Sequence, residues 1–275
     1  MRRTITGFSN PTVKFLRSLR DKKHRRREGR FLAEGLRLLT DARETGHLPE
    51  MLVMASGRDD HPLLAALEAA VAAAGGEIVE TTEDILAKIT GKENPQAVAG
   101  VFAEFDTSLA TVDRNAAPIW LVAQAMRDPG NLGTMLRTGD AIGAGGLILI
   151  DDCADPFSVE AVRASMGAIF TQRLVQARWD EFLPWLRGGE KGGEKRGEGQ
   201  LVAASLRDPT DYRQATYRAP CFILVGNESR GLPAEYEAEC DLRVTIPMLG
   251  RADSLNAAIA GAVLGYEALA HLRES

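Results

Sequence analysis

Cysteine is scarce in this chain, which has three in 275 residues. Cys153, Cys221 and Cys240 lie far apart, with no CxxC pair and no nearby histidine to complete a metal set. This spacing argues against a disulfide scaffold and against structural zinc. We therefore expect no metal site.

The sequence also lacks an apolar run that could cross a membrane. The stretch 255–269 is apolar, but it is shorter than the ~20 residues that a spanning helix needs, and Asn256 and Glu267 interrupt it. We expect a buried helix here and no membrane partner. The N-terminus begins Met1-Arg2-Arg3 with no apolar stretch behind it, so a secretory signal is not expected and the cytoplasm is the expected compartment.

A strong charge of one sign is absent too, because the formal net charge is −5. Taken alone, this value argues against a nucleic-acid partner. The distribution argues the other way: residues 1–50 carry thirteen Lys or Arg and six Asp or Glu, a net of +7, which leaves −12 for the rest. The basic front of the chain is therefore the candidate for contact with an acidic polymer.

The first hundred residues alternate between helical and extended patterns. Between residues 11 and 46 we expect two helices that flank a basic loop, Lys22 to Arg30. Further strands are expected at 51–54, 77–80 and 98–105, and further helices at 62–74 and 82–89. This alternation predicts a small α/β domain over residues 1–105. Residues 106–117 are polar and small with little periodicity, as expected for a linker.

The rest of the chain, residues 118–275, has longer apolar runs. Strands are expected at 119–123, 146–150, 173–175, 201–205, 221–225 and 242–246, and helices near 131–142, 158–170, 179–187, 233–239 and 254–272. Apolar runs indicate strands covered on both faces, so we predict a parallel α/β domain. Residues 188–200 have too few apolar residues to become ordered by burial, and we expect a flexible surface insertion there.

The common nucleotide-binding fingerprints are missing from this α/β pattern. No GxxxxGK[ST] segment occurs, and the glycines at 143–146 precede a strand instead of following one. These absences argue against P-loop NTPases and dinucleotide-binding enzymes. A GxSxG nucleophile elbow is missing as well, which argues against an acyl-transfer hydrolase.

Three segments next to predicted strands combine glycines with uncharged polar residues. They are DPGNLGTMLRTGD at 128–140, GNESRGL at 226–232 and IPMLGRADSLNAA at 246–258. The last two suit a small ligand held by backbone groups, so they predict a cofactor pocket. In the first, Asn131 is placed to cap a helix, and Arg137 follows about one and two-thirds turns along it.

In this order and spacing, the three segments resemble the motifs of the SpoU/TrmH-type RNA ribose methyltransferases of the SPOUT superfamily. The resemblance covers residues 118–272 and is specific, because three motifs are in register at successive strand ends. Residues 1–105 resemble, more weakly, the ribosomal-protein-like substrate-binding domain that many such enzymes carry. The resemblance implies a small α/β RNA-binding domain followed by a parallel-sheet methyltransferase domain with a trefoil knot, a rare exception to un-knotted chains.

The resemblance also implies a cofactor, a reaction and partners. S-adenosylmethionine would bind in the knot, held mainly by main-chain groups of the second and third motifs. Its methyl group would pass to a ribose 2′-hydroxyl of RNA. Ribosomal RNA is favoured over tRNA, because an added N-terminal domain suggests a folded substrate that needs a second contact. The family pattern further implies a homodimer, and the small residues of the last helix would allow close packing.

Candidate site residues follow from the motifs and from the basic stretch. The catalytic candidates are Arg137, Asn131, Glu228 and Asn256. The cofactor-binding candidates are Gly226, Ile246, Met248, Ser254 and Leu255. The RNA-binding candidates, whose charges could meet several phosphates, are Lys22, Lys23, Arg25, Arg26, Arg27 and Arg30. Because arginine keeps its charge at neutral pH, we interpret Arg137 as an electrostatic stabiliser of the forming alkoxide, with a role as base left open.

Simpler roles stand beside these. A helix cap would explain Asn131, a surface ion pair would explain Arg137, and a solvated face would explain the basic run. A tRNA methyltransferase, or a non-catalytic RNA-binding or ribosome-assembly factor with the same fold, are the alternative functions. The chain also departs from the family pattern at Glu160, where many relatives carry lysine, and this change bears on substrate choice without touching the three motifs.

Overall fold

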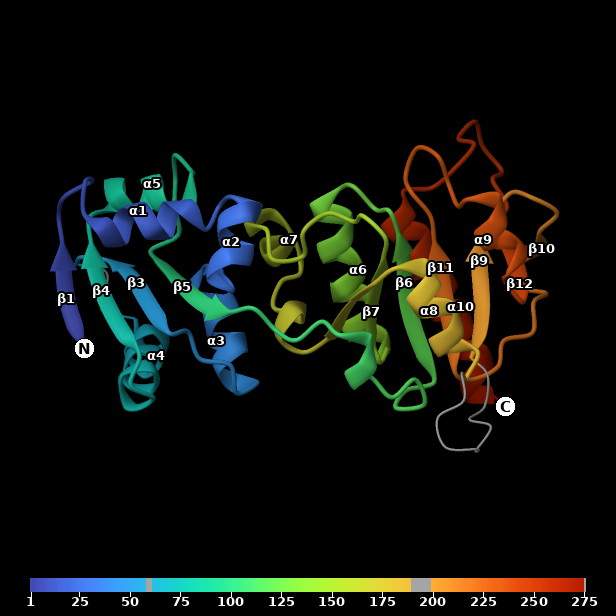
Figure 1. Ribbon diagram of the computed structural model, residues 1–275, viewed down its shortest axis with the longest axis horizontal. Coiled ribbons are helices and arrows are strands. Elements are labelled where there is room, and N and C mark those ends of the chain that lie inside the picture. Colours follow the sequence, from blue (N-terminus) through green and yellow to red (C-terminus); the bar gives the residue numbers. More distant parts are fainter. Residues whose placement is uncertain (58–60, 189–198, 275) are drawn as a thin grey trace. The chain divides into compact units, whose positions relative to one another are not determined.

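The computed structural model describes residues 1–57, 61–188 and 199–274 (Figure 1). Its contacts divide the chain into two compact units, residues 1–105 with 155–171, and residues 106–154 with 172–275. By contact, the expected linker 106–117 belongs to the second unit and the segment 155–171 belongs to the first. The domain limits 1–105 and 118–275 remain a prediction. The expected insertion 188–200 lies mostly outside the described residues, and its last residue, Gln200, begins a strand.

The first unit contains a five-stranded sheet in the order β1-β4-β3-β5-β2. Its strands are β1 (Arg2–Ile5), β2 (Arg30–Glu34), β3 (Met51–Ala55), β4 (Glu77–Thr81) and β5 (Val98–Ala103). Strands β1, β4 and β3 are parallel, whereas β5 pairs antiparallel with β3 and β2. Its helices are α1 (Pro11–Ser18), α2 (Lys22–Glu28), α3 (Leu36–Glu44), α4 (Pro62–Ala73), α5 (Glu83–Thr90) and α7 (Val159–Ala164), with a 3₁₀ turn η2 (Ala168–Phe170).

The expectation of a basic loop at Lys22 to Arg30 is wrong, because residues 22–28 form helix α2. The Asp21 side chain accepts hydrogen bonds from the backbone of Lys23 and His24, which caps the helix start. Gly29 ends it in the left-handed conformation (φ 60°), which glycine adopts without steric cost. The apolar residues after it, expected to be helical, begin instead as strand β2.

The segment 155–171 joins the first unit through an aromatic cluster around Phe31. Phe31 is fully buried, and its ring lies 5.1 Å from Phe157, 5.6 Å from Phe102 and 6.2 Å from Phe170, centroid to centroid. The expected continuous helix 158–170 is wrong, since α7 ends at Ala164 and η2 starts at Ala168. The break coincides with positive φ angles at Met166 (50°) and Gly167 (96°), which no α-helix contains.

The second unit is a seven-stranded, wholly parallel sheet in the order β10-β12-β9-β11-β6-β7-β8. Its strands are β6 (Ile119–Gln124), β7 (Gly146–Ile150), β8 (Arg173–Ala177), β9 (Gln200–Ala204), β10 (Thr210–Asp211), β11 (Cys221–Val225) and β12 (Leu242–Thr245). Its helices are α6 (Pro129–Ile142), α8 (Trp179–Leu186), α9 (Ala234–Ala238) and α10 (Ala257–Glu274), with a 3₁₀ turn η1 (Leu109–Thr111). The predicted α/β class with a parallel sheet is confirmed. The short strands β1 and β10 were not foreseen.

Alternating strand residues point to the two faces of this sheet, and helices cover both faces. Trp120 and Phe222 stack on one face and pack with α8, whereas Leu121 and Val225 on the other face approach glycines of α10. Helix α10 also packs against α6, and both lie against β6. Because all strands are parallel, their carboxyl ends share one edge, which is where open α/β sheets place ligands.

Candidate functional site

Three loops that follow parallel strands of the second unit carry the three predicted motifs. The first follows β6 and leads into α6, the second (226–233) follows β11, and the third (246–256) follows β12 and leads into α10. Strand β11 pairs with β6 on one side and with β9 on the other, and β12 lies beyond β9. The loops therefore meet at the carboxyl edge of the sheet.

Glu228 ties the first and second loops together. Its carboxylate accepts hydrogen bonds from the backbone N–H groups of Arg127 and Asp128, each at 3.2 Å, and from Asn131 Nδ2 at 3.1 Å. Asn227 adds a second tie, because its Nδ2 donates to the backbone oxygen of Ala125 at 2.8 Å. Glu228 thus fixes the start of α6 although it is exposed at the protein surface.

The same hydrogen-bonded set lowers the pKa of Glu228. Partial burial acts to raise the pKa of this carboxyl, but hydrogen bonds from its own backbone N–H, the Asn131 amide and the backbone of Arg127 and Asp128 outweigh it. All of these donors favour the charged form. Glu228 is therefore an anionic acceptor at neutral pH, a group that orients its neighbours and does not supply a proton.

Asn131 extends the hydrogen-bonded network from Glu228 to the third loop. Its Oδ1 accepts a hydrogen bond from Asn256 Nδ2 at 2.8 Å, across 125 positions of the chain. Asn256 in turn caps α10, because its Oδ1 accepts from the backbone N–H of Ala258 at 2.9 Å and of Ile259 at 3.3 Å. Three of the four predicted catalytic residues thus form one connected cluster, Glu228–Asn131–Asn256.

Two expectations about helix starts need correction. Asn131 does not cap α6; Asp128 does, since its side chain accepts from the backbone N–H of Asn131 at 2.8 Å. Pro129 follows at the first helical position, where its missing N–H costs nothing. The last helix starts at Ala257 and not at Ser254. Because Asp128 caps α6, the side chain of Asn131 is available to the cluster.

Arg137, the fourth predicted catalytic residue, lies on α6 six positions after Asn131. It is exposed, and its side chain makes no hydrogen bond or ion pair with any residue that the structure describes. The surface ion pair that would explain it structurally is therefore not seen in the described part of the chain. A guanidinium in this state is available to an external anion.

A cavity of about 450 Å³ opens between the second and third loops. All five predicted cofactor-binding residues line it: Gly226, Ile246, Met248, Ser254 and Leu255. Glu228 lies on the wall as well, so the cavity reaches the catalytic cluster. The apolar part of the wall comes from strand ends and α10, including Val225, Val244 and Leu264.

Gly226 is required by the shape of the second loop. The loop closes on itself through a hydrogen bond from Gly231 N to Asn227 O at 2.9 Å. A Cβ at position 226 would lie 2.5 Å from the carbonyl carbon of Gly231 and 2.6 Å from the nitrogen of Leu232, closer than real Cβ contacts. Only glycine allows this turn to form beside the cavity.

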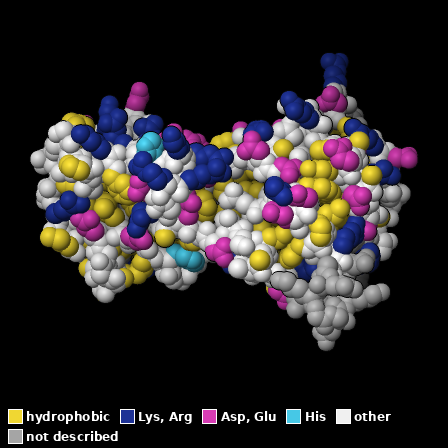
Figure 2. All heavy atoms as spheres, in the orientation of Figure 1, with side chains coloured by type: hydrophobic (Ala, Val, Ile, Leu, Met, Phe, Trp, Pro, Cys, Tyr) yellow, Lys and Arg dark blue, Asp and Glu magenta, His cyan; other side chains and the backbone are white. Residues whose placement is uncertain are grey.

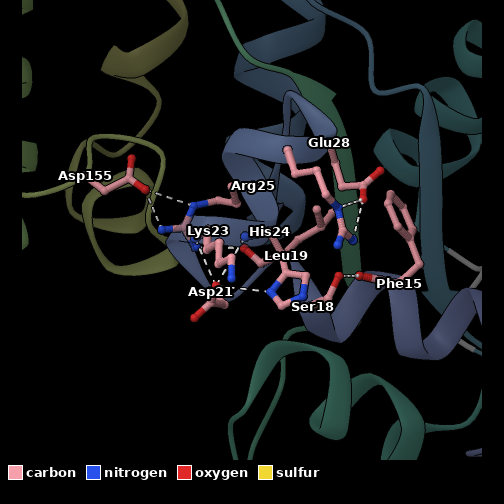
Figure 3. Close-up of polar contacts among 10 residues, drawn as sticks. Phe15, Ser18, Leu19, Asp21, Lys23, His24, Arg25, Glu28 and Asp155 are labelled. Carbon is pink, nitrogen blue, oxygen red and sulfur yellow. Dashed lines mark hydrogen bonds and ion pairs between the residues drawn. The ribbon is translucent and has the colours of Figure 1, made fainter.

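The predicted RNA-binding residues divide into two groups. Lys23, Arg26 and Arg27 are exposed on α2, and Figure 2 shows Lys and Arg side chains gathered over α1 and α2. Arg25 instead is buried, 2% exposed, and points toward Asp155, away from solvent (Figure 3). Its inclusion among the RNA-binding candidates is therefore wrong.

Helix α1 and the turn after it add cations that the sequence prediction left out. Lys14 and Arg17 on α1 and Arg20 in the turn are exposed and line a shallow hollow together with Asp21. We call the exposed cations of α1, this turn and α2 the basic face; its members are Lys14, Arg17, Arg20, Lys23, Arg26 and Arg27. Lys22 and Arg30 are partly buried, and Arg30 pairs with Glu50 at 2.6 Å.

Among the described residues, no group of three or more His, Cys, Asp or Glu is arranged to hold a metal ion. Within the same residues, no helix combines the length and apolar character that a membrane crossing needs.

Comparison with known proteins assigns both parts of the chain. The sequence model of the SpoU rRNA Methylase family matches residues 118–266, and that of the MRM3-like substrate binding domain matches residues 10–100. The chain belongs to the SpoU rRNA methylase family. It is 31% identical over 271 residues to the 23S rRNA (guanosine(2553)-2′-O)-methyltransferase RlmP of Bacillus subtilis, covering 98% of each chain.

Solved structures share the fold over nearly the whole chain. An AdoMet-bound rRNA methyltransferase from Sinorhizobium meliloti is 38% identical with a TM-score of 0.88, covering 98% of each chain. The SpoU methyltransferase AviRb from Streptomyces viridochromogenes, in complex with AdoMet, is 28% identical with a TM-score of 0.84, covering 97% of this chain and 99% of its own. The predicted family is confirmed.

Some residues of the site escaped the sequence prediction. Ser205, Arg207 and Glu237 line the same cavity, although they belong to none of the three SpoU motifs. Ser205 follows β9 directly, and a polar residue at the carboxyl end of a parallel strand was the available signal. The position of Glu237 had no such signal, because a glutamate in a short amphipathic helix is usually solvated.

Proposed function

We propose that this chain is an S-adenosylmethionine-dependent methyltransferase that methylates a ribose 2′-hydroxyl of ribosomal RNA. The observation that carries the proposal is the Glu228–Asn131–Asn256 cluster on the rim of the 450 Å³ cavity. The cluster and the cavity bring together residues from all three motifs. Relatives named as rRNA 2′-O-methyltransferases, over nearly the whole chain, support the choice of reaction and RNA.

The cavity fits the proposed cofactor in size and chemistry. Its volume lies within the ~300–1,000 Å³ of small-molecule sites. Strand ends and α10 offer apolar contacts, while the loops of the second and third motifs offer backbone groups. A buried carboxylate oxygen of Glu237, which accepts no hydrogen bond from any described residue, offers an acceptor on the wall. Gly226, Ile246, Met248, Ser254 and Leu255 would hold the cofactor.

The chemistry divides simply between cofactor and protein. When bound, S-adenosylmethionine supplies a methyl group that its sulfonium already activates. The chain must then align the ribose hydroxyl and stabilise the oxygen as it loses its proton. Arg137 is the group for the second task, because it carries a permanent charge and has no partner within the described residues. Asn131, held by Glu228 and Asn256, is the polar group that orients the site.

We assign RNA binding to the first unit. Its basic face offers six exposed cations on α1, α2 and the turn between them, enough to contact several phosphates and to make binding fall with salt. The family match of residues 10–100 to a substrate binding domain supports this assignment. Ribosomal RNA in the cytoplasm is the proposed substrate and setting.

A knotted second unit and a homodimer complete the proposal. Helix α10 packs on β11, β6 and α6 after the chain has left β12 near the far end of the sheet, as expected for a C-terminal segment that returns through the fold. Ile259 and Tyr266, two helical turns apart on α10, are 46% and 54% exposed. An apolar stripe of this kind suits a second copy of the chain.

The proposal is tested by methyl transfer from radiolabelled S-adenosylmethionine to ribosomal RNA from cells that lack this protein. We expect label on a single nucleotide with the wild type. We expect a rate at least a hundredfold lower with Arg137→Ala, by analogy with loss of one transition-state donor, and unchanged cofactor affinity. Equal labelling by both proteins would contradict the role of Arg137. If the wild type labels no RNA but binds it tightly, the protein is a binding factor and not an enzyme.

A further inference from the structure

Glu237 is a buried carboxylate on the wall of the cofactor cavity, outside the three motifs. It lies on α9 and is 6% exposed. A charged group is seldom buried without partners, because its desolvation is costly. The contacts of Glu237 therefore show whether this carboxylate has only a structural role or is also available to a ligand.

The two oxygens of this carboxylate differ. Oε1 accepts a hydrogen bond from Ser205 Oγ at 2.7 Å, and Ser205 Oγ itself accepts from Arg207 N at 3.0 Å. Oε2 lies 3.2 Å from Arg207 Nη1, which gives charge compensation, but it accepts no hydrogen bond from any described residue. One buried acceptor thus remains unsatisfied beside a cavity that Ser205, Arg207 and Glu237 all line.

The missing partner is a neutral donor. The Arg207 guanidinium already neutralises the carboxylate, and a second cation at Oε2 would meet repulsion from it. This argues against an ammonium group and favours a hydroxyl. Carboxylates at the carboxyl edge of α/β sheets are well suited to hydroxyls of a nucleoside ribose, because each hydroxyl donates one short hydrogen bond to an anionic oxygen.

We propose that Glu237 Oε2 accepts a hydrogen bond from a ribose hydroxyl of the cofactor's adenosine, which makes Glu237 a specificity determinant for a ribonucleoside cofactor. The inference rests on the proposed function, since it needs an adenosine-containing cofactor in this cavity. Ser205 is then a positioning residue, because it holds Oε1 and leaves Oε2 directed to the ligand.

The test measures binding of S-adenosylhomocysteine and its 2′-deoxy and 3′-deoxy analogues by calorimetry. For the wild type, we expect one of the deoxy analogues to bind about tenfold to a hundredfold more weakly, as for the loss of a hydrogen bond to a charged group. In Glu237→Leu, we expect the three compounds to bind with nearly equal affinity. Glu237→Gln, which keeps an acceptor without charge, should retain a smaller preference for the hydroxyl and serves if the leucine variant does not fold.

The controls separate this inference from a structural role and from the proposed function. Arg207→Met removes the charge partner and keeps the acceptor, so the preference for the hydroxyl should remain. Glu237 variants that weaken all three compounds equally, or that retain the full preference, would overturn the inference. If Glu237→Leu weakens S-adenosylhomocysteine and the two deoxy analogues equally but does not weaken an N6,N6-dimethyl analogue, which has no N6–H donor, then Glu237 contacts the adenine amine and the inference is overturned. A wild type that binds none of the compounds would instead refute the cofactor proposal.

Discussion

Arg25 Nη2 lies 2.6 Å from Asp155 Oδ2, although 130 positions separate the two residues in the chain. Arg25 Nε also donates to the same oxygen at 3.2 Å, and Nη1 donates to the backbone oxygen of Leu19 at 2.8 Å. The side chains are 2% and 12% exposed. One cation of the most basic stretch of the chain is therefore a structural group that joins α2 to the segment 155–171.

Arg25→Met should destabilise the first unit, because it leaves the Asp155 carboxylate and the Leu19 carbonyl without their buried donor. We expect a loss of about 3 kcal/mol in the free energy of unfolding, typical of breaking a buried pair from one side. Urea unfolding followed by circular dichroism measures this loss. Arg26→Met, one position away and exposed, is the matched control and should leave stability unchanged. Equal stability of the two variants would rule out a structural role for the pair.

Arg25→Met and Arg26→Met should have the opposite relative effects on RNA binding. Arg26→Met should reduce the slope of log affinity against log salt by about one, because one phosphate contact is lost. Folded Arg25→Met protein should keep the wild-type slope. Filter binding to ribosomal RNA fragments between low and physiological salt measures both slopes, with Arg37→Met on α3 as the control for an exposed cation outside the basic face. A wild-type slope in Arg26→Met would remove α2 from the interface.

The different fates of Arg25 and Arg26 show where prediction from sequence ends. Both carry the same charge in one basic run, and only a partner 130 positions away distinguishes them. The helix α2 itself was missed because it has no apolar stripe; its signals were the cap at Asp21 and the glycine at 29. By contrast, strand β11 was predicted with its correct limits, since a run of five buried apolar residues leaves little choice.

The site shows the same division. The three motifs could be located from their composition, their order and their resemblance to the family pattern, and all five predicted cofactor-binding residues line one cavity. Glu237 could not be found, because its burial depends on Ser205 and Arg207 from another strand end. The cap of α6 was misassigned to Asn131 although the pair Asp128-Pro129 carried the usual signal for a helix start.

Glu228 should make stability depend on pH in acid. Its pKa is lowered in the folded state, so its ionised form stabilises the fold above the unfolded-state pKa, and this contribution is lost as pH falls through the lower, folded-state value. Glu228→Gln cannot titrate. We therefore expect the difference in melting temperature between wild type and variant to be constant near neutral pH and to shrink as pH falls below 4.5, the ordinary value for glutamate. A difference that stays constant or widens in acid would contradict the assigned hydrogen bonds.

Substitutions at Asn256 can separate effects on stability from effects on methyl transfer, because its side-chain oxygen and nitrogen make different contacts. Oδ1 caps α10, whereas Nδ2 donates to Asn131 Oδ1 at 2.8 Å. Asn256→Ser keeps a capping oxygen and removes the donor without adding a charge next to Asn131 Oδ1, so we expect near wild-type stability with methyl transfer lowered about tenfold, the effect of one lost hydrogen bond. Asn256→Ala removes both and should also lose about 1 kcal/mol of stability.

Thermal unfolding and single-turnover methyl transfer, measured on the same preparations, distinguish these outcomes. If Asn256→Ser retains full activity, Asn256 serves only as a cap and Asn131 is oriented by Glu228 alone. If Asn256→Ser is as unstable as Asn256→Ala, the loss of the amide disturbs more than the contact with Asn131, since serine is as good a cap as asparagine. The expected pattern, a stable protein that transfers methyl groups slowly, would place the orienting function in the single hydrogen bond between the first and third motifs.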